Sequence, residues 1–224
     1  MLLAKDRVTN PQSYRIHNIP NGSFRCSILV FGWFGFNAGS ALSANGLAAH
    51  AFMTTATSCG AAMVSWMFIE VMQSGKPSLV GAATGLVAGL VAITPGAGFV
   101  PIWSAVIIGI IVSPICYFMI AVVKKKFGYD DALDAFGCHG IGGMWGGIAT
   151  GIFGLSSINS VAEWNGLCFG DTKLFIAQVV SILVTIVVAI VGTLICLTIT
   201  KLITPIRVSK KDELIGLDKS EHSE

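Results

Sequence analysis

The chain has 224 residues, of which 54% are hydrophobic and 12% are charged, and its formal net charge is +2. Ordinary soluble domains carry about 25% charged residues. The composition therefore excludes a typical soluble domain and indicates a membrane protein.

Long stretches of the chain contain no Lys, Arg, Asp or Glu; they cover residues 27–69, 77–123, 135–162 and 174–200. Because a spanning helix needs roughly 20 apolar residues, the two longest stretches must each contain more than one span. The turn signals SANG, SGKPS, TPGAG and KKKFGYDD divide them. The expected helices cover 27–42, 47–73, 78–94, 102–123, 132–153 and 173–203. The sequence thus predicts an all-α, polytopic membrane protein with about six transmembrane helices.

Basic residues are divided unequally between the two sides of this predicted bundle. If successive helices alternate in direction, one side receives Arg25, Lys76, Lys124–Lys126 and the basic residues of both ends, whereas the other receives only Lys173. By the positive-inside rule, both termini are predicted to be cytoplasmic. The expected organisation is an N-terminal cytoplasmic arm (1–26), a membrane domain (27–203) and a C-terminal cytoplasmic tail (204–224).

The six cysteines have no CxxC spacing, and most of them fall inside the expected helices. They are interpreted as small buried apolar residues. No metal site, disulfide or cofactor is expected.

Glycines recur every four residues in two of the expected helices. Gly81, Gly85 and Gly89 share one face of the third helix, and the fifth helix repeats the pattern at Gly143, Gly147 and Gly151. Such faces allow the backbone of another helix to approach closely. We expect close packing there and no chemistry.

The first expected helix carries Trp33, Phe36, Asn37 and Ser40 at the spacing of one helical stripe. With a cytoplasmic N-terminus, Ser40 is outermost and Phe36 lies one turn deeper. The stripe fits a hydroxyl binding point above an aromatic gate, although an aromatic stripe of this kind is more often plain packing.

His139 and Asp134 are ionisable residues at the start of the fifth helix. His139 shares its face with Gly142, Gly143 and Gly146. An ionisable group in a span indicates a functional site, although a neutral histidine can also bond neighbouring helices together. Asp134 precedes His139 by five positions, about 140° around an α-helix, and suits a structural role at the helix start better than proton transfer.

Several motifs resemble the ammonium transporter (Amt/Rh) family. They are FGWFGFNAGSALSAN, GKPSLVGAATGLVAGLVAITPGAGFV, DDALDAFGCHGIGGMWGGIATGIF and RVSKKDELIGLD, and the resemblance extends from His17 to Asp218. It implies a channel in the cell membrane, usually a homotrimer, in which two halves of each subunit form inverted repeats. The present helices resemble the last six of the family's eleven, so we expect half of this inverted-repeat channel fold.

The resemblance also implies roles for individual residues. His139 matches one of two pore histidines, Phe36 one of two stacked gate phenylalanines, and Ser40 the outer ammonium-recruitment serine. The tail matches a segment that meets a PII-type regulatory protein. The implied function is transport of ammonium or ammonia through a hydrophobic pore, which needs no enzymatic chemistry, no cofactor and no nucleic acid.

The sequence departs from the family in two places. Nothing matches the first five helices, which carry the partner histidine and the other gate phenylalanine, and NGSFRC places polar residues where the family is apolar. One hypothesis is that the chain is the C-terminal half of a channel whose N-terminal half is a separate chain or has been lost. The alternative is a truncated, transport-inactive remnant, or an assembly partner of intact subunits.

Overall fold

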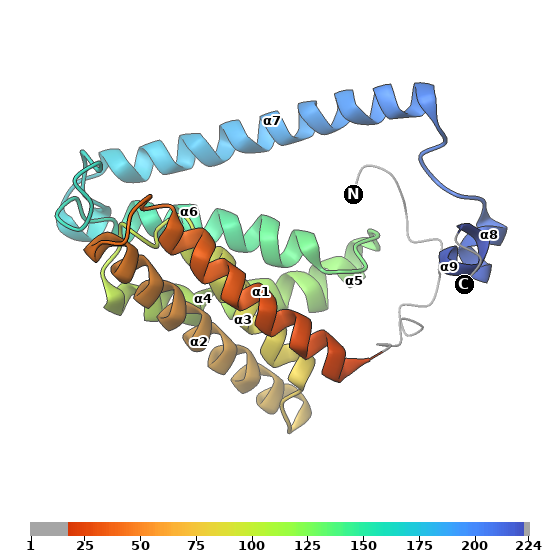
Figure 1. Ribbon diagram of the computed structural model, residues 1–224, viewed down its shortest axis with the longest axis horizontal. Helices are drawn as coiled ribbons and strands as arrows, with labels where there is room; N and C mark the ends of the chain where they lie inside the picture. The colour runs from red at the N-terminus through yellow and green to blue at the C-terminus, as the bar shows by residue number, and fades with distance from the viewer. Residues whose placement is uncertain (1–17, 222–224) are drawn as a thin grey trace. The chain divides into compact units, whose positions relative to one another are not determined.

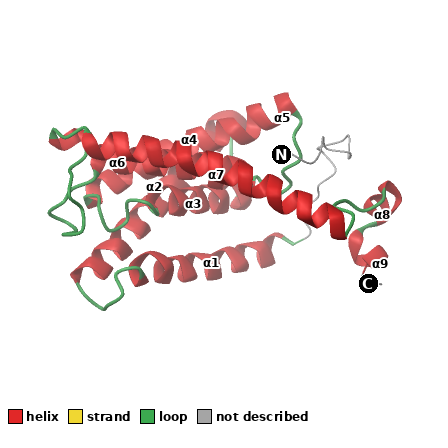
Figure 2. Ribbon diagram, turned by 90° about the horizontal axis from the view of Figure 1, so that it is seen from above, coloured by secondary structure: helices red, strands yellow, loops and turns green. Residues whose placement is uncertain are grey.

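A computed structural model describes residues 18–221 of the chain. The chain divides into two compact units, Met1–Val179 and Val180–Glu224. Residues 1–17 and 222–224 lie outside the described part, and with them Lys5, Arg7, Arg15 and most of the expected N-terminal arm. Within residues 18–221, the regular structure is helical and contains no strand (Figures 1 and 2).

The described part of the first unit contains six α-helices, three short helices of other types and the first turns of a seventh α-helix. These elements are α1 (Ile19–Gly39), α2 (Gly46–Ser74), α3 (Leu79–Ile93), α4 (Ile102–Phe118), the π-helix η2 (Met119–Val123), α5 (Lys124–Phe127), the π-helix η3 (Phe136–Ile141), α6 (Gly142–Phe153), the 3-10 helix η4 (Leu167–Phe169) and the start of α7 (Lys173–Ile203). The second unit holds the rest of α7, with α8 (Lys210–Ile215) and α9 (Leu217–Glu221).

The expected helices are all present, but the first begins at Ile19 and not at Ser27. Its start is set by Asn18, whose side chain accepts a hydrogen bond from the Asn21 N–H, and by a proline in the first turn. Arg25 therefore lies inside α1. The polar sequence NGSFRC, which we expected to precede the helix, belongs to it.

Three helices of the described residues are long and apolar enough to cross a membrane: Gly46–Ser74, Ile102–Phe127 and Lys173–Ile203. Leu79–Ile93 is also apolar but shorter. This content makes the chain a multi-pass membrane protein, as the composition predicted.

Helix α2 packs against both α3 and α4 and forms the centre of the first unit. Ala62, Ile93, Ile108 and Val112 are fully buried in this core. Two buried hydroxyls hydrogen-bond between helices: Ser58 Oγ donates to the Gly89 carbonyl (3.0 Å), and Ser113 Oγ donates to the Ala62 carbonyl (2.7 Å). In an apolar surrounding these bonds satisfy polar groups that water cannot reach.

The glycine face predicted for the third helix is confirmed. Gly81, Gly85 and Gly89 are buried in α3. A β-carbon at Gly89 would lie 2.6 Å from Ala62 Cβ and 2.7 Å from the Ser58 carbonyl oxygen. Only glycine allows α3 to come this close to α2.

The glycine face predicted for the fifth helix is confirmed at Gly147 and Gly151, which are buried, and wrong at Gly143. A β-carbon at Gly143 would meet nothing closer than Val91 Cγ1 at 3.9 Å, which is an ordinary contact. At Gly146 it would collide with the Ala92 carbonyl oxygen. Gly146, and not Gly143, therefore sets the distance between α6 and α3. Gly151 does pack closely, but against Phe175 of α7.

Successive helices of the first unit run in opposite directions (Figure 1). The start of α1, the turn between α2 and α3, and α5 lie at one end, while the turn between α1 and α2 and the end of α6 lie at the other. Helix α1 lies on the outside of this bundle in both views (Figures 1 and 2). The arrangement carries Arg25, Lys76 and Lys124–Lys126 on elements of the same end.

Candidate functional site

Three aromatic rings from two helices form a row on the surface of the first unit. The Trp33 ring stacks on the His139 ring, with ring centres 6.3 Å apart and 29° between the planes. On α1, the Phe36 ring meets Trp33 edge-on at 6.1 Å. His139 is exposed, and 63% of Phe36 is exposed. The structure thus brings together two of the site residues predicted from sequence, with Trp33 between them.

Trp33 is held in place by a hydrogen bond to α3. Its indole Nε1–H donates to Thr94 Oγ1 (2.8 Å), and the Thr94 hydroxyl donates to the Leu90 carbonyl (2.7 Å). A tryptophan ring with its one donor satisfied has a fixed orientation. Trp33 therefore offers a rigid surface against which His139 and Phe36 rest.

The stripe predicted on α1 is divided between two surfaces. Asn37 is turned into the bundle, is only 6% exposed, and donates from Nδ2 to Thr55 Oγ1 of α2 (3.0 Å). Phe36 and Ser40 stay exposed. Asn37 is thus a structural tether of α1 to α2, and the surface residues of the stripe are Trp33, Phe36 and Ser40.

Ser40 caps the C-terminal end of α1. Its hydroxyl donates to the Phe36 carbonyl (2.8 Å), so the serine proton is already used. The oxygen lone pairs remain as acceptors at an exposed position. This arrangement suits a ligand that only donates hydrogen bonds.

His139 lies in the π-helix η3, where the chain is wound more widely than in an α-helix. Within residues 18–221, neither of its ring nitrogens has a hydrogen bond, and the imidazole ring stacks on Trp33. The packing interpretation requires a hydrogen bond from His139 to another helix, and the described residues contain no such bond. Its nitrogens are available to a group from outside them.

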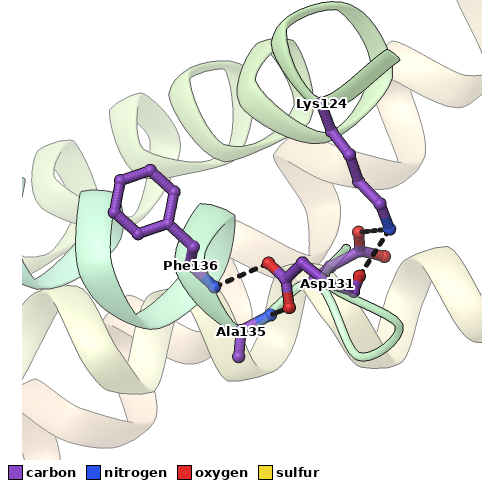
Figure 3. Close-up of polar contacts among 5 residues, drawn as sticks. Lys124, Asp131, Ala135 and Phe136 are labelled. Carbon is purple, nitrogen blue, oxygen red and sulfur yellow. Dashed lines mark hydrogen bonds and ion pairs between the residues drawn. The ribbon is translucent and has the colours of Figure 1, made fainter. Parts of the chain in front are cut away.

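The start of this helix is organised by Asp131 and not by Asp134 (Figure 3). The Asp131 carboxylate accepts from the N–H groups of Ala135 and Phe136, both at 2.9 Å. These are free donors of the first helical turn, which carboxylates stabilise.

Asp134, which we expected inside the first turn, precedes the helix with a positive φ of 54°. Its carboxylate pairs with the Lys124 ammonium at 2.7 Å, and Lys124 also donates to the Asp131 carbonyl (2.6 Å). The angular argument from an α-helix does not apply to Asp134, because neither it nor the π-helix that follows has α-helical geometry. Partial burial, followed by the nearby charge of Asp131, raises the pKa of the adjacent Tyr129 phenol.

The sequence pointed to a capping role for Asp130, Asp131 and Asp134 alike, and the structure assigns it to Asp131. The roles of Thr94, Thr55 and Lys124 were not predicted. An indole N–H in an apolar helix needs a partner, which was a signal for Thr94, but the partner's position along the chain is not a local property. Within the described residues, no group of His, Cys, Asp and Glu side chains could hold a metal ion.

Comparisons with known proteins identify the family of the chain. The profile described as Ammonium Transporter Family matches residues 2–224. The ammonium transporter of Bacillus subtilis is 46% identical over 208 residues, covering 93% of this chain and 51% of the relative. Ammonium transporter Amt1 of Archaeoglobus fulgidus is 40% identical over 225 residues, covering 100% of this chain and 56% of the relative.

Solved structures show the same fold. The crystal structure of Saccharomyces cerevisiae Mep2 superposes with a TM-score of 0.80 at 33% identity, covering 88% of this chain and 45% of that chain. The helices and their packing thus define a multi-pass membrane protein with half of a channel fold. The chain belongs to the ammonium transporter family. It spans about half the length of the curated relatives that it matches.

Proposed function

We propose that this chain forms one wall of a pore that carries ammonium or ammonia across the membrane. The observation that carries the proposal is the exposed row of His139, Trp33 and Phe36, in which an imidazole without a hydrogen-bond partner among the described residues lies against two aromatic rings. The family membership supports the substrate. Transport needs no covalent step, and no enzymatic activity or cofactor is proposed.

The proposed roles follow from the cost of dehydrating ammonium. A bare cation in an apolar pore costs many kcal/mol unless it is coordinated or loses its proton. Ser40, whose oxygen is free to accept, is the outer recruitment residue, and the Phe36 ring is the gate below it. Cation–π attraction to such a ring contributes about 0.5–2 kcal/mol. His139 then meets the permeant with one donor and one acceptor nitrogen, or relays its proton.

A further wall completes the pore in this proposal. The open side of the ring row supports this, because an imidazole and a gate ring that faced lipid would not enclose a path for the permeant. That wall is a segment that resembles the first half of an ammonium transporter. The exposure of the same rings also favours a second candidate, in which the chain conducts nothing and only assembles with intact subunits.

The remaining roles are proposed from the family resemblance. Asp134 is a structural residue at the helix start, consistent with its ion pair to Lys124. Both termini are cytoplasmic, residues 27–203 form the membrane domain, the complete protein is a homotrimer, and the tail from 204 to 224 meets a PII-type regulatory protein.

Uptake of radiolabelled methylammonium tests the function. We expect cells that express this chain with the first half of the Bacillus subtilis transporter to accumulate the label, and cells that express either chain alone to remain at background. His139→Leu lowers the uptake at least tenfold, because the pore loses its imidazole. Val184→Leu on the exposed side of α7 is the matched control and leaves uptake unchanged.

Membrane abundance and co-purification of the two chains are measured in parallel. Co-assembly without uptake would reject the transport role and favour the assembly partner. Uptake that persists in His139→Leu would reject the role of this histidine.

A further inference from the structure

A cavity of about 310 Å³ lies in the first unit, at the end of the bundle where α6 ends and α7 begins. Four segments line it: the turn after α3, the end of α6 with the residues that follow, the loop around Trp164, and the first turns of α7. Its volume falls at the lower end of the range of about 300–1,000 Å³ typical of small-molecule pockets. His139, Phe36 and Ser40 do not line it, so it is separate from the ring row.

The walls of the cavity are fixed by hydrogen bonds between the segments. The Leu155 N–H donates to the Phe99 carbonyl (2.8 Å), which joins the loop after α6 to the turn after α3. The Gly166 N–H donates to the Gly154 carbonyl (2.7 Å). The Asn165 side chain accepts from both the N–H and the hydroxyl of Ser156, at 2.8 and 2.9 Å. A cavity built on such contacts is pre-formed, which lowers the entropic cost of binding.

One carboxylate, one indole and one amide line this cavity together with apolar side chains. Phe99, Leu155 and Leu174 supply apolar surface, and Glu163 is the one charged residue of the lining. Among residues 18–221, the Glu163 carboxylate has no ion pair and accepts no hydrogen bond. Trp164, which is 39% exposed, Gln178 and Thr150 complete the polar part of the lining, and the Thr150 hydroxyl already donates to the Gly146 carbonyl.

These groups define the chemistry of a ligand. A carboxylate beside an indole face attracts a cation through charge and through cation–π attraction. The apolar part of the lining favours a ligand with a hydrocarbon part, because removing apolar surface from water lowers the free energy. An anion is repelled by Glu163, and a neutral apolar molecule gains nothing from it.

We propose that this cavity binds a small alkylammonium ion, with the ammonium group at Glu163 and Trp164 and the alkyl chain on Phe99, Leu155 and Leu174. The site is independent of the pore proposal, because it uses none of the residues of the ring row. Binding here is a property of the first unit and needs no partner chain.

Calorimetric titration of the purified chain in detergent micelles with n-butylammonium tests this proposal. We expect saturable binding at one site, with a dissociation constant on the order of 1 mM, as for a small ligand in a partly open site. Glu163→Gln raises the dissociation constant at least about fivefold, since the charge is lost. Glu163→Asp, which keeps the charge, changes it by less than about threefold.

Two controls separate this site from general charge and apolar effects. Asp130→Asn removes one negative charge from the loop before η3, outside the lining, and leaves the affinity unchanged. n-Butanol, which has the same alkyl chain without the charge, binds at least about fivefold more weakly. The proposal is overturned if Glu163→Gln binds n-butylammonium as well as the unaltered chain, if n-butanol binds equally, or if the folded chain shows no saturable binding.

Discussion

Asp131 and Lys124 hold the start of the helix that carries His139. Asp131 accepts from two N–H groups of the first turn, and Lys124 joins the preceding loop through the Asp134 carboxylate and the Asp131 carbonyl (Figure 3). The Lys124 and Asp134 side chains are about one-third exposed, at 28% and 32%. Such a pair contributes only about 0–1 kcal/mol. The capping bonds of Asp131 are therefore the stronger of the two restraints.

Asp131→Ala tests whether the capping bonds of Asp131 stabilise the helix start. We expect it to lower the free energy of unfolding by about 1 kcal/mol, within the 0.5–2 kcal/mol of a lost N-cap. Unfolding in mixed detergent micelles, followed by circular dichroism, measures the change. The neighbouring Asp130 makes neither of these bonds. The free energy of unfolding of Asp130→Ala is therefore expected to stay within about 0.5 kcal/mol of that of the unaltered chain. Equal effects of the two substitutions would contradict the capping role.

At the scale of elements, the contact between α6 and α3 depends on which glycine faces α3. The π-helix η3 comes directly before α6 and contains wider turns than an α-helix, so an α-helical repeat counted from His139 to the glycines of α6 does not hold across this junction. Gly146 lies against the Ala92 backbone, while Gly143 has room at 3.9 Å from Val91. The His139 ring stacks on Trp33 of α1.

Paired alanine substitutions distinguish the two glycines. Gly146→Ala forces the backbone of α3 away from α6 and should cost about 1–3 kcal/mol of stability, as overpacking does. Gly143→Ala places a methyl group in ordinary contact and should be neutral, or stabilising by up to about 1 kcal/mol because alanine favours a helix over glycine. Thermal unfolding in detergent compares them, and a greater loss for Gly143→Ala would refute the assigned register.

At the scale of the molecule, most of the described basic residues of the first unit lie on elements of one end. Arg25, Lys76 and Lys124–Lys126 belong to the start of α1, the turn after α2, and α5, whereas Lys173 begins α7 at the other end of α6. Membrane insertion places basic loops on the cytoplasmic side. This division agrees with the orientation proposed from the sequence.

Labelling of lysines in intact cells tests the orientation. A membrane-impermeant amine reagent, with modified peptides identified by mass spectrometry, is expected to label Lys173 from outside and to reach Lys125 and Lys126 only after permeabilisation. The result depends on the position of each lysine and not on transport activity. Labelling of Lys125 or Lys126 in intact cells would reverse the proposed topology.

Sequence alone predicted the helices well because each one is a local property. An uncharged apolar stretch between turn signals has one stable form in a membrane, a helix that satisfies its own backbone. The bounds of α7 were predicted without error, at Lys173–Ile203. The error at α1 is also local: Asn18 and Pro20 are ordinary start signals, and they were outweighed by the polar residues that follow.

The candidate site was only partly predictable. The sequence indicated His139, Phe36 and Ser40 one by one, and the resemblance grouped them, but neither separated Asn37 from its neighbours on the stripe. Asn37 is buried because Thr55 of α2 accepts its hydrogen bond, whereas Phe36 meets no such partner. Which face of a helix is buried depends on residues distant in sequence.

The membrane class, the order of the helices and the division of charge are therefore determined by the sequence itself, since they depend on hydropathy, turn residues and the count of lysines. The tertiary structure alone decided that Trp33 lies between Phe36 and His139, that Gly146 sets the α6–α3 distance, and which of three neighbouring aspartates caps the helix start. The physical reason is that each of these depends on a positive φ, a π-helix or a contact between distant segments, and none of them changes the helical periodicity that a sequence displays.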